Sequence, residues 1–179
     1  RQMGIQILPP DINSGIAEFS VKDGKMVYGL SAIKNIGRNV IDEIVREREK
    51  NGAYKSLQDF LERMPGKEVN KRTVENLILA GAFDGMEGNR RQKMMVYPEI
   101  MANIATTNRN AMEGQLSLLD FLGEAEKEEF EIKMPAVEDY NKEERLAAEK
   151  QVLGVYISGH PLEDYRKLIE KHADATSMD

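Results

Sequence analysis

The feature that most limits the fold is a series of short helical patterns between Ser31 and Met86. Apolar residues recur there every three or four positions, as they do on the buried face of an amphipathic helix. The patterns are separated by residue types that favour turns and helix C-termini, at Gly37, Asn51-Gly52, Pro65-Gly66 and Gly81. Ser56 and Asn70 each stand just before a pattern, where a side-chain oxygen can cap a helix. The spacing therefore predicts several short helices packed around one core.

Only the N-terminal part alternates as β-strands do. An Asp23-Gly24 pair separates two short alternating runs, and such a pair tolerates the positive φ of a tight hairpin turn. Before it, Ile5 and Ile7 alternate as in a strand that Pro9-Pro10 ends, because proline lacks the ladder donor. A small β-hairpin is therefore predicted within residues 1–30.

The C-terminal half changes character after a further predicted helix over 89–112, with an expected kink at Tyr97 before a proline. Between Glu113 and Glu149 there are 12 acidic and four basic residues, a charge density that predicts a solvated linker. Helical order is expected to resume near Asn141. A helix face would then be shared by Leu146, Val152, Leu153 and Tyr156, and Pro161 would open a last helix over 162–172.

Composition excludes several kinds of site. The 179 residues contain no Cys, which removes disulfides, thiolate metal sites and cysteine nucleophiles. The two histidines, His160 and His172, lack the partners of a zinc site or a catalytic triad. The acidic residues are scattered, without the paired arrangement of a two-metal site, and no apolar run approaches a membrane span of roughly 18 residues. We therefore expect no catalytic residue, metal or cofactor in this chain, no membrane contact and a cytoplasmic location.

The segment from Ala32 to Ile44 is the strongest local signal for binding. Two short helices joined by a tight turn would leave backbone amides free at the start of the second helix, where anions bind. This pattern resembles a helix-hairpin-helix, which holds the nucleic-acid backbone without reading bases. Asn35 replaces the usual first glycine of the turn, and it tolerates left-handed geometry. The predicted DNA-binding residues are Lys34, Asn35, Ile36, Gly37, Arg38, Asn39, Lys71 and Arg72, the last two opening a degenerate second copy.

A purely structural alternative explains the same spacing. An αα-hairpin that serves only to pack the chain would show the same small turn residues and the same apolar positions. The formal net charge of −6 argues against strong DNA binding by the chain alone, although residues 34–93 carry 13 basic and 10 acidic side chains.

A second candidate is the segment Gln115-Leu116-Ser117-Leu118-Leu119-Asp120-Phe121. A short segment with an amide, alternating leucines and a terminal aromatic can lie extended on a partner and fill apolar pockets. The alternative is a strand or helical turn that packs against the chain's own core. Gly114 before the segment and the acidic sequence after it favour a tether.

Several longer motifs resemble bacterial replicative DNA polymerases of the C family, the DNA polymerase III α subunits. The motifs follow the family's order over nearly the entire chain: MGIQILPPDIN, YGLSAIKNIG, KSLQDFLERM, VNKRTVENLILAGAFD and LGVYISGHPLEDY. The resemblance implies a fold that is mainly α, with a small N-terminal β-hairpin, a tandem helix-hairpin-helix, further helices and an acidic linker. The implied regions are the end of the fingers at 1–30, the DNA-binding helices at 31–112, a clamp-binding segment and linker at 113–140, and a helical connector at 141–179.

The same resemblance implies the partners. Duplex DNA would lie along the helix-hairpin-helix region, and the sliding clamp would bind Gln115, Leu116, Ser117, Leu118, Leu119 and Phe121. Either Leu119 or Phe121 would fill the pocket that usually takes an aromatic ring. Other replisome subunits would be met through the parent protein.

The resemblance also implies what this chain lacks. The family's metal-binding aspartates and their magnesium belong to a palm region that no motif here matches. The chain starts at Arg1, so we expect a piece of a longer protein. Because no motif matches the family's metal-binding region, we expect this piece of a DNA-directed DNA polymerase to be non-catalytic and to support processive synthesis. The rival interpretations are a helix-hairpin-helix module of a repair or recombination enzyme, and an interaction domain that touches no DNA.

Overall fold

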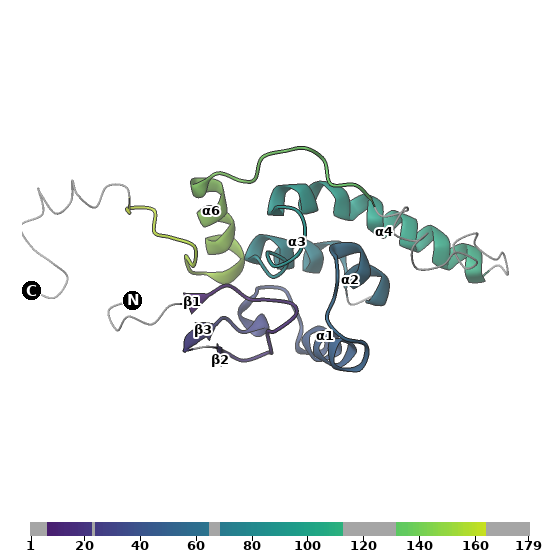
Figure 1. Ribbon diagram of the computed structural model, residues 1–179, viewed down its shortest axis with the longest axis horizontal. Coiled ribbons are helices and arrows are strands. Elements are labelled where there is room, and N and C mark those ends of the chain that lie inside the picture. The colour runs from purple at the N-terminus through teal and green to yellow at the C-terminus, as the bar shows by residue number, and fades with distance from the viewer. Residues whose placement is uncertain (1–6, 23, 65–68, 113–131, 164–179) are drawn as a thin grey trace, which may run out of the picture.

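The computed structural model describes residues 7–22, 24–64, 69–112 and 132–163. It is mainly helical with one small sheet, as predicted (Figure 1). The elements are β1 (Ile7–Leu8), β2 (Ser20–Lys22), β3 (Lys25–Val27), the 3₁₀ helix η1 (Leu30–Ala32), α1 (Arg38–Asn51), α2 (Leu57–Arg63), α3 (Lys71–Ala80), α4 (Arg90–Met112) and α6 (Lys142–Leu153).

The sheet confirms the predicted hairpin, and the strand predicted before Pro9 pairs with it. Strands β2 and β3 pair antiparallel, and Gly24 in the turn between them has a φ of 73°. Strand β1 pairs parallel to β3, so that Ile7 lies opposite Met26, and Pro9 follows directly after the strand. The segment from Gly29 onward then leads from the sheet into the helices.

Two of the helices begin at the predicted caps. The Ser56 hydroxyl accepts the backbone N–H of Asp59 at 3.1 Å, and the Asn70 side chain accepts that of Thr73 at 3.0 Å. Helix α3 ends at Gly81, whose φ of 86° is left-handed. A Cβ at this position would lie 2.3 Å from Nη2 of Arg90, so the close approach of Arg90 also requires glycine.

The core joins the helices through one chain of aromatic rings. Tyr54, Phe60 and Phe83 are buried and meet edge to face, with centroids 5.1 Å apart in both pairs. The Tyr54 hydroxyl donates to the carbonyl oxygen of Ile44 at 3.0 Å. Burial of the ring raises the pKa of Tyr54 to about 12, because the phenolate would lose its hydration.

Arg90 and Glu149 form a buried ion pair that connects α3, α4 and α6. Their side chains are 3% and 1% exposed, and Nη1 of Arg90 lies 3.4 Å from Oε1 of Glu149. Arg90 also binds Asp84 at 2.7 Å and donates to the Leu79 carbonyl at 3.0 Å. The second oxygen of Glu149 accepts the amides of Ile157 and Ser158, at 2.8 and 2.9 Å. Burial disfavours the guanidinium charge, yet the bonds to Asp84 raise the pKa of Arg90 overall.

The second part of the predicted acidic linker lies half-exposed against the protein. Residues 132–141 arch over the N-terminal half of α4 toward α6 (Figure 1), and Ile132 and Met134 pack against the core. Asn89 donates to the Val137 carbonyl at 2.9 Å, and Gln92 to the Pro135 carbonyl at 2.6 Å. The number of charged residues does not reveal these contacts, because apolar side chains and backbone carbonyl oxygens make them.

Three further expectations meet the structure with different outcomes. Helix α4 continues through Pro98 without a break. The side chains of Leu146, Val152 and Leu153 are buried on α6 as predicted, whereas Tyr156 follows the end of that helix and is 36% exposed. The predicted last helix, 162–172, lies mostly outside the described residues.

Among the helices of the described ranges, none combines the length and apolarity that crossing a membrane requires.

Removing the buried carboxylate tests this packing. Glu149→Ala should lower the free energy of unfolding by about 3–5 kcal/mol, because Arg90 loses a buried partner and two amides lose their acceptor. Urea unfolding followed by circular dichroism measures the change. The matched control is Glu143→Ala, an exposed acid of the same helix, which should cost less than about 0.5 kcal/mol. A loss of less than about 1 kcal/mol for Glu149→Ala would contradict the assigned role.

Candidate nucleic-acid interface

The hairpin between η1 and α1 has the geometry of a tight turn between two helices. Ile33 is buried and Ile36 packs partly against the core, so the apolar side chains fix both ends of the turn. Asn35 lies between them with a φ of 61°, the left-handed conformation that its residue type tolerates. The turn is thus made as predicted, with asparagine in the place of glycine.

Two distant elements hold this turn in place. The Asn76 amide of α3 donates to the Lys34 carbonyl at 2.6 Å, and the Lys34 N–H donates to the Val152 carbonyl of α6 at 2.8 Å. Both polar groups of the Lys34 backbone are therefore satisfied inside the protein. Sequence reasoning missed Asn76, because a lone asparagine within a helical pattern carries no sign of its partner 42 residues away.

The N-terminus of α1 is left without a cap. Gly37 occupies the N-cap position and no side chain accepts from the first turn, while its carbonyl accepts the amides of Val40 and Ile41. Within the described ranges, the amides of Gly37, Arg38 and Asn39 have no acceptor. A Cβ at Gly37 would meet nothing within 4 Å, so the space beside these amides is open. Such a helix start can hold an anion.

Arg38 is a hairpin cation that already has ion-pair partners within the protein. Its Nη1 lies 2.6 Å from Oε1 of Glu18, and its Nε lies 2.9 Å from Oδ1 of Asp42. The hydrogen bond to Glu18 is the main cause that raises the pKa of Arg38, and the same bond lowers the pKa of Glu18. Asp42 lies four residues along the same helix, a common spacing for helical ion pairs, whereas Glu18 lies 20 residues away in the sequence.

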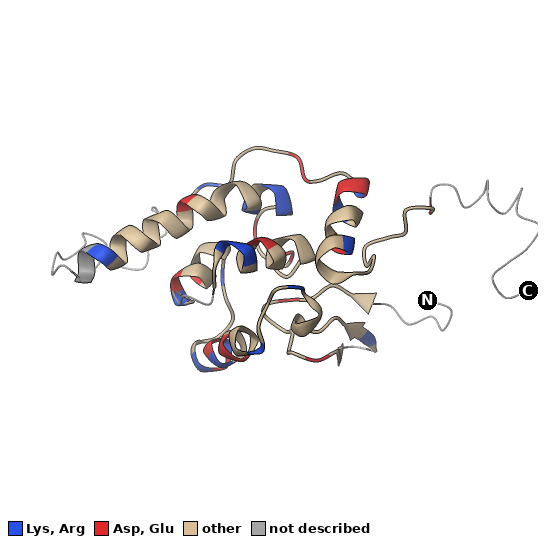
Figure 2. Ribbon diagram, turned by 180° about the vertical axis from the view of Figure 1, so that it is seen from behind, with Lys and Arg blue, Asp and Glu red and all other residues tan. Residues whose placement is uncertain are grey.

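The other predicted cations are exposed beside the hairpin. Lys34, Lys71 and Arg72 are exposed, and none has an ion-pair partner in the part of the chain that the structure describes. Arg72 lies one helical turn before Asn76, which contacts the Lys34 backbone, so the start of α3 faces the turn region. Figure 2 shows basic residues at the start of α3 and at the hairpin on the same side of the molecule.

Several basic residues counted between 34 and 93 are unavailable for binding. Arg90 and Lys93 are buried, and Lys93 donates to the carbonyls of Met86 and Gly88. Burial lowers the pKa of Lys93 because the ammonium loses its hydration. Arg63 lies between Glu47 and Asp59, at 3.1 Å from each, and over the Tyr54 ring at 4.3 Å. The local positive excess is therefore smaller at the surface than in the sequence.

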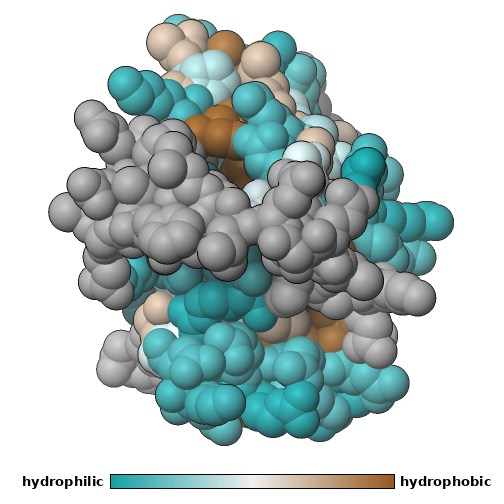
Figure 3. Space-filling view, turned by 90° about the vertical axis from the view of Figure 1, so that its right-hand side faces the viewer, coloured by the Kyte–Doolittle hydropathy of each residue, from teal (hydrophilic) through white to brown (hydrophobic). Residues whose placement is uncertain are grey.

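The solvent face of α1 adds no apolar binding surface. In Figure 3 the surface over this helix, at the bottom of the view, is predominantly hydrophilic. Its exposed side chains include charges of both signs, at Arg46, Glu49 and Lys50. The hairpin end of α1 is thus the part of this helix that combines free amides with an open surface.

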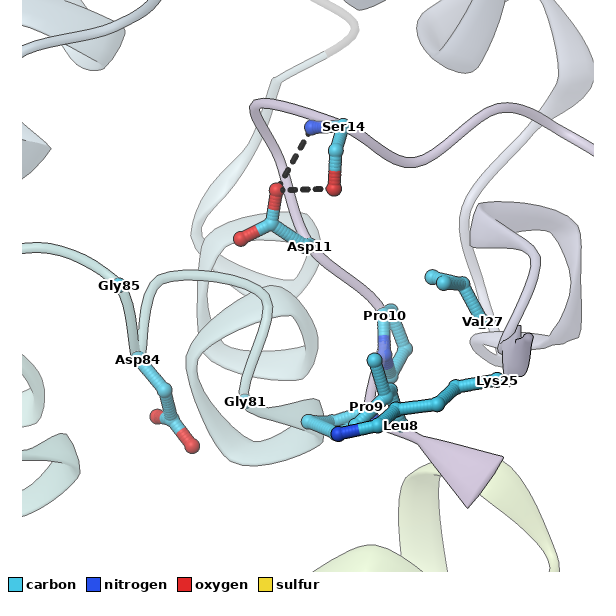
Figure 4. Close-up of a pocket in the computed structure, with 10 residues that line it drawn as sticks. All are labelled: Leu8, Pro9, Pro10, Asp11, Ser14, Lys25, Val27, Gly81, Asp84 and Gly85. Atoms are coloured by element: carbon cyan, nitrogen blue, oxygen red, sulfur yellow. Dashed lines mark hydrogen bonds between the residues drawn. The ribbon is translucent and has the colours of Figure 1, made fainter. Parts of the chain in front are cut away.

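A pocket of about 430 Å³ lies between the sheet and the turn after α3 (Figure 4). Both of its carboxylates serve the protein: Asp11 accepts the amide and hydroxyl of Ser14, and Asp84 binds Arg90. Within the described ranges there is no group of three or more metal-ligating side chains. The two carboxylates of the pocket therefore have structural roles. The His160 ring likewise accepts the amide of Leu162 at 3.1 Å.

The predicted clamp-binding residues, 115–119 and 121, lie outside the described residues. Helix α4, which ends at Met112, leads directly into that segment.

Comparison with known families agrees with this geometry. A family model described as a helix-hairpin-helix motif matches residues 4–93, which include the sheet, the hairpin, α2 and α3. The chain therefore belongs to the helix-hairpin-helix family.

Curated relatives narrow the assignment to one kind of protein. The chain is 41% identical over 174 residues to DNA polymerase III subunit alpha of Vibrio cholerae, covering 96% of the chain. It is 38% identical over 170 residues to that of Borreliella burgdorferi, and 36% identical over 178 residues to that of Escherichia coli K12, covering 95% and 99% of the chain. The predicted resemblance to bacterial DNA polymerase III α subunits is confirmed. The chain spans about 15% of the length of each of these three relatives, so it matches a fragment of them.

Proposed function

We propose that this chain holds the backbone of duplex DNA for a replicative polymerase. The observation that carries the proposal is the uncapped start of α1, where three amides have no acceptor in the described residues and the space beside Gly37 is open. A phosphate oxygen at this helix N-terminus would receive those hydrogen bonds and the favourable end of the helix dipole. Such a contact carries no base information, so it suits a protein that must move along any sequence.

The cations around the hairpin support a weak grip. Lys34, Lys71 and Arg72 are exposed and can meet neighbouring phosphates, whereas Arg38 is shared with two carboxylates. Two to four phosphate contacts would give a logarithmic salt slope of roughly −2 to −4. The chain's net charge of −6 keeps the affinity of the isolated piece low. Weak, sequence-neutral contacts of this kind keep a duplex in register without trapping it.

We propose further that residues 115–121 bind the sliding clamp. The support is the sequence itself: an amide, alternating leucines and an aromatic residue, followed by an acidic stretch. Joining a weak DNA contact to a clamp contact raises the effective concentration of each partner for the other. The combination would lengthen the time that the polymerase stays bound to DNA. The names of the relatives favour this function over a repair module, which would bind DNA and have no need of the clamp.

Nucleotide transfer is assigned to the remaining part of the polymerase. The relatives are more than six times as long as this chain, which leaves ample sequence for a magnesium-dependent active site elsewhere. In this proposal the chain itself uses no cofactor, and its contribution is processivity.

A pair of substitutions at Gly37 tests the phosphate site. Asp and Asn both cap helices well, and the open space admits either side chain, so folding stability should stay within about 1 kcal/mol of the parent. Gly37→Asp should weaken duplex binding at least about tenfold at low salt, because a carboxylate occupies the anion site, and Gly37→Asn should weaken it only a few-fold. Fluorescence anisotropy with several duplex sequences measures both. Unchanged affinity in Gly37→Asp would overturn the proposal.

A leucine truncation tests the clamp contact. Leu118→Ala should weaken clamp binding by about 2 kcal/mol, because a tethered segment depends on a few buried anchors. Its folding stability should hardly change, whereas a core leucine truncated to alanine loses about 2–5 kcal/mol. Surface plasmon resonance with the sliding clamp and thermal unfolding provide the two readouts, with the exposed Leu162→Ala as a control. Unfolding of Leu118→Ala, or no clamp binding by the parent chain, would show that the segment has another role.

A further inference from the structure

Glu18 stands at the DNA-facing hairpin although it comes from the loop before β2. Its Oε1 lies 2.6 Å from Nη1 of Arg38, which is the first residue of α1. Both side chains are well exposed, at 63% and 59%, so the pair lies where a phosphate would arrive. Nothing in the core requires a carboxylate at this position.

Backbone hydrogen bonds fix the position of the loop that bears Glu18 beside the hairpin. The amides of Leu30 and Ser31 donate to the carbonyls of Ile16 and Ala17, at 2.8 and 3.1 Å, and the Ser31 hydroxyl also donates to Ala17. Gly29 packs so closely that a Cβ there would lie 2.4 Å from the Ala17 oxygen. The loop that bears Glu18 is therefore joined to η1, the first helix of the hairpin, and the pairing with Arg38 follows from the fold.

The two carboxylates around Arg38 block both of its binding edges. A guanidinium binds phosphate best with two parallel N–H groups on one edge. Asp42 accepts from Nε on one edge, and Glu18 accepts from Nη1 on the other. Each edge thus has one donor already engaged, and a two-point contact with phosphate requires one carboxylate to leave.

We propose that Glu18 competes with the DNA phosphate for Arg38 and so limits the affinity of the hairpin. This inference rests on the proposed function, since it assumes that the hairpin meets the backbone. Exposed ion pairs contribute little stability, so an incoming phosphate can replace the Glu18 carboxylate, and Arg38 returns to Glu18 when the duplex moves on. The carboxylate acts as an internal substitute for phosphate, and it keeps the grip reversible.

Neutralising Glu18 tests the competition directly. Glu18→Gln should tighten duplex binding about three- to tenfold at low salt, and should steepen the logarithmic salt slope by about one, because Arg38 gains a phosphate contact. Glu49→Gln is the matched control, since it removes the same charge from an exposed site at the far end of α1. The control should change affinity less than about twofold and leave the slope unchanged. The measurement is anisotropy with duplex DNA over a range of salt concentrations.

Repeating the test in the Arg38→Gln variant separates competition for Arg38 from the general effect of removing a negative charge. In Arg38→Gln, the further change Glu18→Gln should give no gain beyond that of the control, because the guanidinium that Glu18 engages is gone. A gain that persists there, or a Glu18→Gln affinity no better than that of Glu49→Gln, overturns the proposal. Weaker binding in Glu18→Gln would overturn it too, and would make Glu18 a residue that positions Arg38.

The failure of this inference is distinct from the failure of the proposed function. If Gly37→Asp loses duplex binding while Glu18→Gln behaves as its control, the hairpin binds DNA and only the competition is wrong. If neither substitution changes binding, or if the parent chain binds no duplex, both proposals fail.

Discussion

The buried pair of Arg90 and Glu149 is the interaction on which the rest of the structure depends. Each side chain also satisfies backbone groups, so the pair joins the end of α3, the start of α4, α6 and the loop after it. Helices α3 and α6 in turn supply Asn76 and the Val152 carbonyl, which hold the two polar groups of Lys34. A charged pair inside the protein thereby fixes a turn at its surface.

This arrangement separates two uses of positive charge. Arg90, Lys93 and Arg63 hold the fold together through carboxylates and carbonyl oxygens, and few cations remain at the surface near the hairpin. The backbone amides at the start of α1 therefore provide the hydrogen bonds with the most defined direction in the proposed DNA contact. In the proposed function, a contact built from amides and a few cations would bind any sequence weakly, because it reads no base.

Local signals in the sequence predicted most of the fold. The caps at Ser56 and Asn70, the hairpin turn at Gly24 and the end of α3 at Gly81 each depend on neighbouring residues, and all were confirmed. The parallel pairing of β1 with β3, the order of residues 132–141 and the burial of Glu149 were not predicted. These depend on partners far along the chain. Glu149 was counted with the solvated acids because its charge is visible in the sequence and its buried partner is not.

The most direct test of the account is to observe the hairpin amides while duplex DNA is added. In ¹H–¹⁵N correlation spectra of the labelled chain, the largest shift changes should occur at Gly37, Arg38 and Asn39, with smaller ones at the start of α3. The same residues should respond to duplexes of different sequence, and the changes should fade as salt is raised. Unchanged amides at Gly37–Asn39, with changes on another surface, would contradict the account.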